Sequence, residues 1–261
     1  MSANMGEPTR DALAGDPLHD PCAEGLRIAT TAKACSLSLK LMGGVGVALR
    51  CPSASAPPLA RSYADIDLAG RRHDSGSIVD LMARLGYRPN HQFNTLHGSS
   101  RLFFWDETNG RQVDVFLDTF QMCHRIDLSR RVEMQGDTLP LADLLLTKLQ
   151  VVETNEKDLK DISAILADHE FSDDDTGINI PYLATLTAKD WGLWKTVSIV
   201  AERADGYATG ADGFDHRDRV RRQVRGLLER LAREPKTRSW RVRDRVGERM
   251  RWYELPEENT E

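Results

Sequence analysis

The chain has 261 residues, of which 40% are hydrophobic and 29% are charged, and its formal net charge is -5 at pH 7. These values are typical of a globular protein with one large or two small domains. They argue against a membrane protein, because no apolar stretch approaches the roughly 18 residues that cross a bilayer. The N-terminal residues lack the apolar core of a secretory signal, so we expect a cytoplasmic location.

The first 22 residues differ in composition from the rest of the chain. They are rich in Gly, Pro, Ala and Asp and show no apolar periodicity, which predicts a disordered tail over residues 1–22. Apolar positions at helical spacing then predict a helix over residues 23–38. The apolar run LKLM follows as a short buried strand that ends at Gly43 and Gly44, and a helix is expected to open there.

The next strand is predicted in the stretch SYADIDLAG. Side chains alternate between the two faces of a strand, so Asp65 and Asp67 point to the same face. A helix with apolar residues three, four and seven positions apart follows in SGSIVDLMARLGY, and Gly86 is a natural stop for it.

A β-hairpin is the clearest local prediction. Asn109 and Gly110 lie between two apolar runs, and Asn-Gly is a strong hairpin signal. In the second strand, Val113 and Val115 face one way and Asp114 faces the other way.

The second half of the chain is predicted to be helical, and the segment AKDWGLWKTVSIVAERA is expected to be one of its helices. The composition changes from mixed strand and helix to helix only near residue 136. We therefore expect an α/β (α+β) fold, with a small mixed β-sheet core flanked by helices over residues 23–135 and a helical domain over residues 136–261.

Three aspartates from two strands suggest a metal site. If the strand of Asp114 lies beside the strand of Asp65 and Asp67, the three carboxylates repel one another or hold a divalent cation. Hard oxygen ligands suit Mg²⁺ or Mn²⁺, which also bind substrate phosphates. The alternative for the first pair is an ordinary solvated strand face.

The paired glycines precede this strand. A strand, a Gly43-Gly44 turn and the start of a helix leave backbone N–H groups open to an anion. The turn is expected to hold a triphosphate while the carboxylates hold its metal.

These motifs resemble the nucleotidyltransferase superfamily that includes DNA polymerase beta, and most closely the AbiEii-type toxin nucleotidyltransferases. The match covers about residues 38–166, with a longer gap between the glycines and the aspartates and with Tyr63 in place of a small hydroxyl residue. The residues that carry the resemblance are Gly43, Gly44, Ala48, Leu49, Arg61, Asp65, Asp67, Asp114, Lys148, Asp158 and Asp161.

The resemblance implies a reaction and roles for these residues. Asp65, Asp67 and Asp114 would be the catalytic metal ligands in the transfer of a nucleoside monophosphate from an NTP, with release of pyrophosphate. Asp114 could also act as the base toward the acceptor. The nucleotide-binding residues would be Gly43, Gly44, Arg61, Lys148, Asp158 and Asp161.

Helical periodicity supports part of this set independently. Lys148 falls inside the apolar stripe of its helix, where it must meet an anion, either a carboxylate or a phosphate. Asp158 also falls within its stripe, although it could simply complement the helix dipole. Asp161 lies at the edge of that stripe, and the resemblance implies that one of the two acids binds nucleotide or orients the lysine.

The C-terminal part is strongly basic. Residues 216–252 contain 14 Lys and Arg against 5 Asp and Glu, a balance of +9. Solvated helix faces explain such a segment without a ligand, but arginine clusters also suit nucleic acid.

The acceptor is expected to be RNA, because the family includes toxins that modify tRNA ends and because the basic segment suits a polyanion. A small molecule or a protein are the other acceptors considered, and an antitoxin is a possible partner. The rival function is a non-catalytic nucleotide- or RNA-binding module, a degenerate transferase that serves as antitoxin or scaffold.

Overall fold

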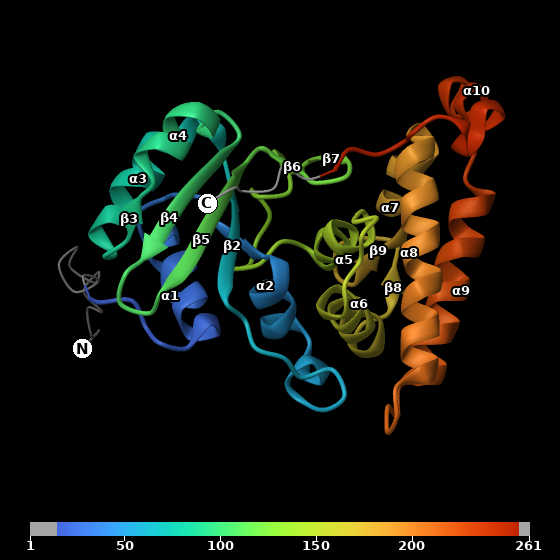
Figure 1. Ribbon diagram of the computed structural model, residues 1–261, viewed down its shortest axis with the longest axis horizontal. Coiled ribbons are helices and arrows are strands. Elements are labelled where there is room, and N and C mark those ends of the chain that lie inside the picture. Colours follow the sequence, from blue (N-terminus) through green and yellow to red (C-terminus); the bar gives the residue numbers. More distant parts are fainter. Residues whose placement is uncertain (1–14, 256–261) are drawn as a thin grey trace, which may run out of the picture.

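The computed structural model describes residues 15–255 as a mixed α/β protein (Figure 1). The first half of the chain contains α1 (Pro21–Ala34), β1 (Lys40–Met42), α2 (Gly43–Arg50), β2 (Asp65–Gly70), α3 (Ser75–Arg84), β3 (Arg88–Pro89), α4 (His91–His97), β4 (Arg101–Asp106) and β5 (Arg111–Leu117). The second half contains β6 (Thr119–Gln121), β7 (Arg125–Asp127), α5 (Leu141–Leu149), α6 (Glu156–Asp168), β8 (Phe171–Ser172), β9 (Ile178–Asn179), α7 (Ile180–Lys189), α8 (Trp191–Gly210), α9 (Arg217–Arg233) and α10 (Arg238–Val246).

Five strands form one mixed sheet in the order β1-β2-β5-β4-β3. The β2 and β5 strands pair in parallel, and the other neighbours pair antiparallel. The predicted hairpin is confirmed as β4 and β5, with Gly110 at φ +62° in the turn. That conformation suits glycine, which explains why the Asn-Gly pair predicted the turn correctly.

One face of the sheet forms a hydrophobic core with α1 and α3. This face carries Ile66 and Leu68 of β2 and Val113 and Val115 of β5, all of which are fully buried. Alternation along the strands then directs Asp65, Asp67 and Asp114 to the opposite face. The hydrophobic pattern therefore fixes the direction in which the carboxylates point.

A second core joins the helices of the second half to the other face of the sheet. Ala69 of β2 and Phe116 of β5 are buried in it together with residues of α5 to α9. In Figure 1, α5 and α6 lie between the sheet and the long helices α8 and α9. The aspartates precede these two residues in their strands, so they lie next to the part of the sheet face that the helices cover.

The predicted N-terminal tail, residues 1–22, lies mostly outside the described residues, and its last part is structured. Pro21 and Cys22 already belong to α1, which Asp20 caps by accepting a hydrogen bond from the backbone N–H of Ala23. Arg111 donates to the backbone carbonyl of Leu18 at 2.8 Å. A cap and a proline at the first helical turn thus start the helix two residues earlier than the periodicity predicted.

Other differences from the predictions are local. The helix predicted to reach residue 38 ends at Ala34, and the single helix predicted over AKDWGLWKTVSIVAERA is divided at Asp190. The Asp190 side chain caps α8 by accepting from the backbone N–H of Leu193. Among residues 15–255, none of the helices combines the length and the apolar character that crossing a membrane requires.

Candidate active site

The three aspartates predicted to form one site lie side by side. Asp67 of β2 and Asp114 of β5 are Cα partners in the parallel pair, and Asp65 lies two residues before Asp67 on the same strand. All three side chains belong to the face opposite the first core. Asp65 is exposed, Asp67 is half-buried and Asp114 is buried.

Asp67 lies at the centre of this negative charge. Burial raises the pKa of its carboxyl to about 7, and the neighbouring charges of Asp65 and Asp114 act in the same direction. Lys148 and Arg101 oppose the rise but do not cancel it. The row of carboxylates therefore holds more negative charge than its neighbours neutralise.

Asp114 is held by two neighbours. Arg101 Nε donates to its Oδ1 at 2.7 Å, and Gln112 Nε2 donates to its Oδ2 at 2.6 Å. Asp65 and Asp67, in contrast, accept no side-chain hydrogen bond from residues 15–255 in the structure. Their oxygens are therefore the ones in the row that are free to accept a ligand.

Within residues 15–255, no three His, Cys, Asp or Glu side chains are grouped so that they could hold a metal ion. The contacts of Asp114 with Arg101 and Gln112 direct its oxygens toward protein donors. The donors that fit a hard cation best are the carboxylate oxygens of Asp65 and Asp67.

Gly43 and Gly44 form the first turn of α2 and do not precede the helix. Gly43 has φ +60°, and a Cβ there would collide with the carboxylate of Asp67. A Cβ on Gly44 would collide with the guanidinium of Arg61. The pair is therefore required by two close side chains, and this requirement explains the glycines without any bound phosphate.

Lys148 meets carboxylates, as its place in the apolar stripe allowed. Its Nζ lies 2.9 Å from Asp158 and 3.0 Å from Asp161, and its side chain is 15% exposed. Arg61 donates to both oxygens of Asp161, from Nε at 2.9 Å and from Nη2 at 2.8 Å. Asp158 also lies in the first turn of α6, where its charge complements the helix dipole.

These contacts join two distant segments of the chain. Arg61 precedes β2, and Asp161 lies 100 residues later on α6. The ionic network of Arg61, Lys148, Asp158 and Asp161 thus fixes α5 and α6 next to the strand that carries Asp65 and Asp67. The structure brings together all of the residues that the resemblance singled out from the second half of the chain.

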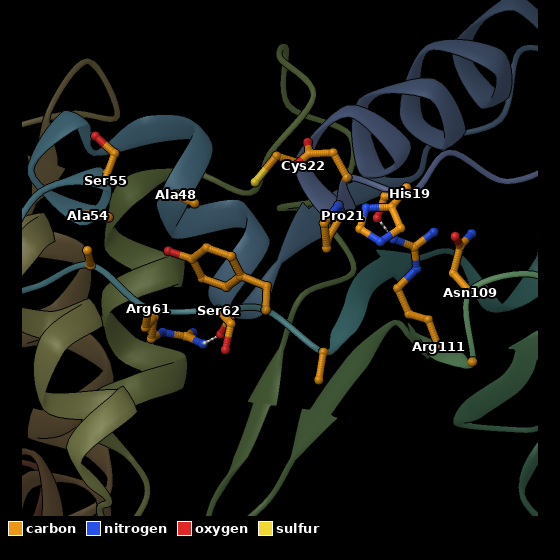
Figure 2. A pocket seen from close by; sticks show the side chains of 15 residues that line it. His19, Pro21, Cys22, Ala48, Ala54, Ser55, Arg61, Ser62, Asn109 and Arg111 are labelled. Carbon is orange, nitrogen blue, oxygen red and sulfur yellow. Dashed lines mark hydrogen bonds between the residues drawn. The ribbon is translucent and has the colours of Figure 1, made fainter.

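An open pocket of about 700 Å³ lies where the chain enters β2 (Figure 2). Figure 2 shows Arg61 and Ser62 on one side of it and Asn109 and Arg111 of the hairpin on another. The lining residues are His19, Asp20, Pro21, Cys22, Ala48, Ala54, Ser55, Ala60, Arg61, Ser62, Tyr63, Ala64, Asn109, Gly110 and Arg111. All of them precede β6, so the lining residues come from the first half of the chain.

Tyr63 lines the pocket with an aromatic ring that contacts Arg61. The Arg61 guanidinium lies 4.3 Å from the centre of the Tyr63 ring. The Tyr63 hydroxyl is buried and has no hydrogen-bond partner among the described residues. Tyr63 therefore shapes the space directly before Asp65.

The basic segment presents cations that are not neutralised. On α9, Val220 and Leu227 are buried against the second core, whereas Arg222 and Arg225 are exposed. Neither of these two arginines forms an ion pair within the part of the chain that the structure describes. Other arginines of the segment do, for example Arg230 with Glu234 on the same helix.

Two residues that contact the site lie outside the predicted set of site residues. Gln112 precedes Asp114 by two positions in the same strand, so strand alternation alone was enough to place it on the same face. Arg101 belongs to a polar stretch before the hairpin, and nothing in that stretch distinguishes it. Its approach to Asp114 depends on the register of β4 against β5, which no local pattern gives.

No protein-family model matches the chain, and no curated protein matches it. The interpretation of the site therefore depends on its geometry and on the motifs in its sequence.

Proposed function

We propose that this protein is a metal-dependent nucleotidyltransferase that moves a nucleoside monophosphate from an NTP to an acceptor hydroxyl. The observation that supports this best is the parallel register that places Asp67 beside Asp114, with Asp65 on the same face. In the reaction, the acceptor oxygen forms a bond to the α-phosphorus and the bond to the β-phosphate oxygen breaks. Pyrophosphate leaves, and the acceptor proton passes to a carboxylate of the row.

The donors in the row fit Mg²⁺ or Mn²⁺. Asp65 and Asp67 offer oxygens without protein donors among residues 15–255. Burial, together with the charges of Asp65 and Asp114, raises the pKa of Asp67 to about 7. A bound divalent ion would supply charge neutralisation for the phosphates and the leaving pyrophosphate. Asp114, oriented by Arg101 and Gln112, would complete the row and serve as the base in the proposed reaction.

Lys148 and Arg61 are the proposed contacts for the triphosphate. Both cations lie next to the carboxylate row, and both are bound to Asp161. In our proposal, the phosphates share these cations with Asp158 and Asp161. The backbone at Gly43 and Gly44 lines the path by which the triphosphate reaches the carboxylate row. The pocket beside Tyr63 offers room for the base and sugar of the nucleotide.

RNA is the acceptor that we favour. The unpaired arginines of α9 suit a polyanion. On the other side of the row, Phe103 of β4 is the Cα partner of Asp114, and Trp105 of the same strand is 40% exposed. Flat rings of this kind stack on unpaired bases, so an RNA end could lie on β4 with its hydroxyl toward Asp114. Such an enzyme could serve as the toxin of a toxin–antitoxin pair.

A non-catalytic binding module is the second candidate. The observation in its favour is that Lys148 and Arg61 are already paired with carboxylates, which makes the ionic network complete without a substrate. Such a module would bind nucleotide or RNA and transfer nothing.

Labelled NTPs separate the two candidates. The protein is incubated with each α-³²P-labelled NTP, Mg²⁺ and total RNA, beside an Asp65→Ala/Asp67→Ala variant and an Asp212→Ala control in the exposed loop after α8. Label in RNA with wild type and control, and none with the double variant, supports the proposal. Label found only in protein or in small molecules would identify one of these as the acceptor in place of RNA. Binding of NTP or RNA without label in any product favours the non-catalytic module.

A further inference from the structure

Arg101 contacts one buried carboxylate and two aromatic rings, although it begins a strand near the surface. Its Nε lies 2.7 Å from Oδ1 of Asp114, a carboxylate that is 3% exposed, and its own side chain is only 25% exposed. The guanidinium carbon lies 5.0 Å from the centre of the Phe116 ring and 5.5 Å from that of Phe93. Two aromatic rings and one buried carboxylate therefore hold this cation in a fixed position.

Strand register explains why Arg101 reaches Asp114. The Cα partner of Arg101 across the β4–β5 pair is Phe116, and Asp114 lies two residues before it on the same face. This diagonal separation is one that a long side chain spans. Arg101 comes from β4, whereas Asp65 and Asp67 come from β2 on the other side of β5.

The charge of Arg101 also acts on the rest of the row. Asp67 is the Cα partner of Asp114 across the β2–β5 pair, so the cation that binds Asp114 also lies near Asp67. Lys148 is shared with Asp158 and Asp161, but Asp114 is the only carboxylate that Arg101 pairs with among residues 15–255. The positive charge of Arg101 therefore partly neutralises the carboxylate row and, within residues 15–255, no other carboxylate.

We propose that Arg101 is a positioning residue that fixes Asp114 and weakens cation binding by the carboxylate row until the nucleotide adds its own negative charge. This inference rests on the proposed function, because it assigns a role at the same site. Two like charges several ångströms apart near a protein surface repel by an amount that corresponds to about tenfold or more in affinity. Nucleotide phosphates offset this repulsion, so Arg101 makes tight cation binding depend on the nucleotide.

The test measures Mn²⁺ binding by electron paramagnetic resonance, with and without a non-hydrolysable NTP analogue. Three variants of the full chain are compared with wild type. Arg101→Gln removes the charge, Arg101→Lys keeps it, and Gln112→Leu removes a neutral hydrogen bond to the same carboxylate. Thermal unfolding of each variant shows whether it is folded.

The charge argument predicts a specific pattern. Without nucleotide, Arg101→Gln binds Mn²⁺ about tenfold more tightly than wild type, and both Arg101→Lys and Gln112→Leu stay within about twofold of wild type. With the analogue, the difference between Arg101→Gln and wild type becomes smaller.

Two other results overturn the proposal in distinguishable ways. If wild type binds Mn²⁺ but Arg101→Gln binds it no more tightly, or Gln112→Leu tightens it equally, the charge of Arg101 has no such role and the proposed function still stands. If no form binds Mn²⁺ under either condition, the metal-dependent function fails together with this inference.

Discussion

Asp67 and Asp114 are direct neighbours across two parallel strands, and buried residues on the reverse face hold them in that position. Ile66 pairs with Val113 and Leu68 with Val115 in the same register, and all four are fully buried. A shift of one residue would turn the aspartates into the core and the apolar side chains out of it. The apolar core therefore keeps two carboxylates adjacent despite their repulsion.

Asp67→Asn is expected to stabilise the fold while it abolishes transfer. The pKa of Asp67 is about 7 in the folded protein, whereas an aspartate in an unfolded chain has its ordinary pKa of 3.8. The folded state therefore keeps the proton to a higher pH than the unfolded state does. As pH rises from about 4 to 7, the unfolded chain releases this proton first, so the stability of wild type falls, by roughly 2 to 4 kcal/mol in total.

The measurement is chemical denaturation between pH 4 and 8 in the presence of EDTA. The difference in unfolding free energy between Asp67→Asn and wild type should grow through this range and level off above pH 7. Asp80→Asn on the exposed face of α3 makes the same change of charge and should show no such growth. A constant difference between Asp67→Asn and wild type at every pH would contradict the argument.

Gly43→Ala is expected to lower both stability and activity. The position has φ +60°, which costs an L-residue about 1 kcal/mol or more, and the added methyl would displace the Asp67 carboxylate. Gly76→Ala is the matched control, because a Cβ there meets no atom within 4 Å and the residue lies in the first turn of α3. Thermal unfolding and NTP transfer of the two variants are compared. Full activity in Gly43→Ala would show that Asp67 need not occupy its observed position.

Much of this site could be predicted from sequence because its signals are local. Strand alternation placed Asp65 and Asp67 on one face, and helical periodicity placed Lys148 among apolar residues. The close approach of Asp67 to Gly43, which excludes a side chain there, could not be predicted, because it depends on how β2 lies against α2. The contact between Arg101 and Asp114 could not be predicted, because it depends on the register between β4 and β5, which is a tertiary property.

The same limit applies to the helices. The cap that ends one helix at Lys189 and starts the next at Trp191 is formed by Asp190. The apolar pattern of the segment continues through Asp190, so periodicity alone predicted one helix. A short side chain that accepts a backbone hydrogen bond decided the boundary.

Lys148→Met is expected to destabilise the fold by about 3 to 5 kcal/mol, because it leaves Asp158 without its cation and Asp161 with Arg61 alone. Combining it with Asp158→Asn should restore part of this loss, since the carboxylate that lost its cation is then neutral. Urea denaturation of the single and double variants measures the difference. A double variant that is no more stable than Lys148→Met would show that the lysine stabilises the protein by packing and not by charge.

Phe103→Leu is expected to weaken the use of an RNA acceptor without changing the use of NTP. Phe103 lies beside Asp114, so loss of its ring removes a stacking surface on the proposed acceptor side, at a cost of about 1 to 3 kcal/mol per base. The KM for RNA should rise, and the KM for NTP should stay within about twofold of wild type. Leu96→Ala on α4, where the side chain is 70% exposed, is the control. An equal rise of both KM values would place the nucleotide, and not the RNA, on β4.

Replacing Arg222 and Arg225 together by alanine is expected to reduce the salt dependence of RNA binding. Each arginine that contacts a phosphate of single-stranded RNA adds about 0.7 to the slope of log affinity against log salt, so the double variant should lose about 1.4. The slope is measured by fluorescence anisotropy of a labelled RNA between low and moderate salt. The matched control replaces Arg219 and Arg230, which are paired with Glu170 and Glu234, and it should change the slope less. If both double variants change the slope equally, net charge and not this face of α9 governs RNA binding, and a wild-type slope near zero would remove α9 from the proposed RNA contact altogether.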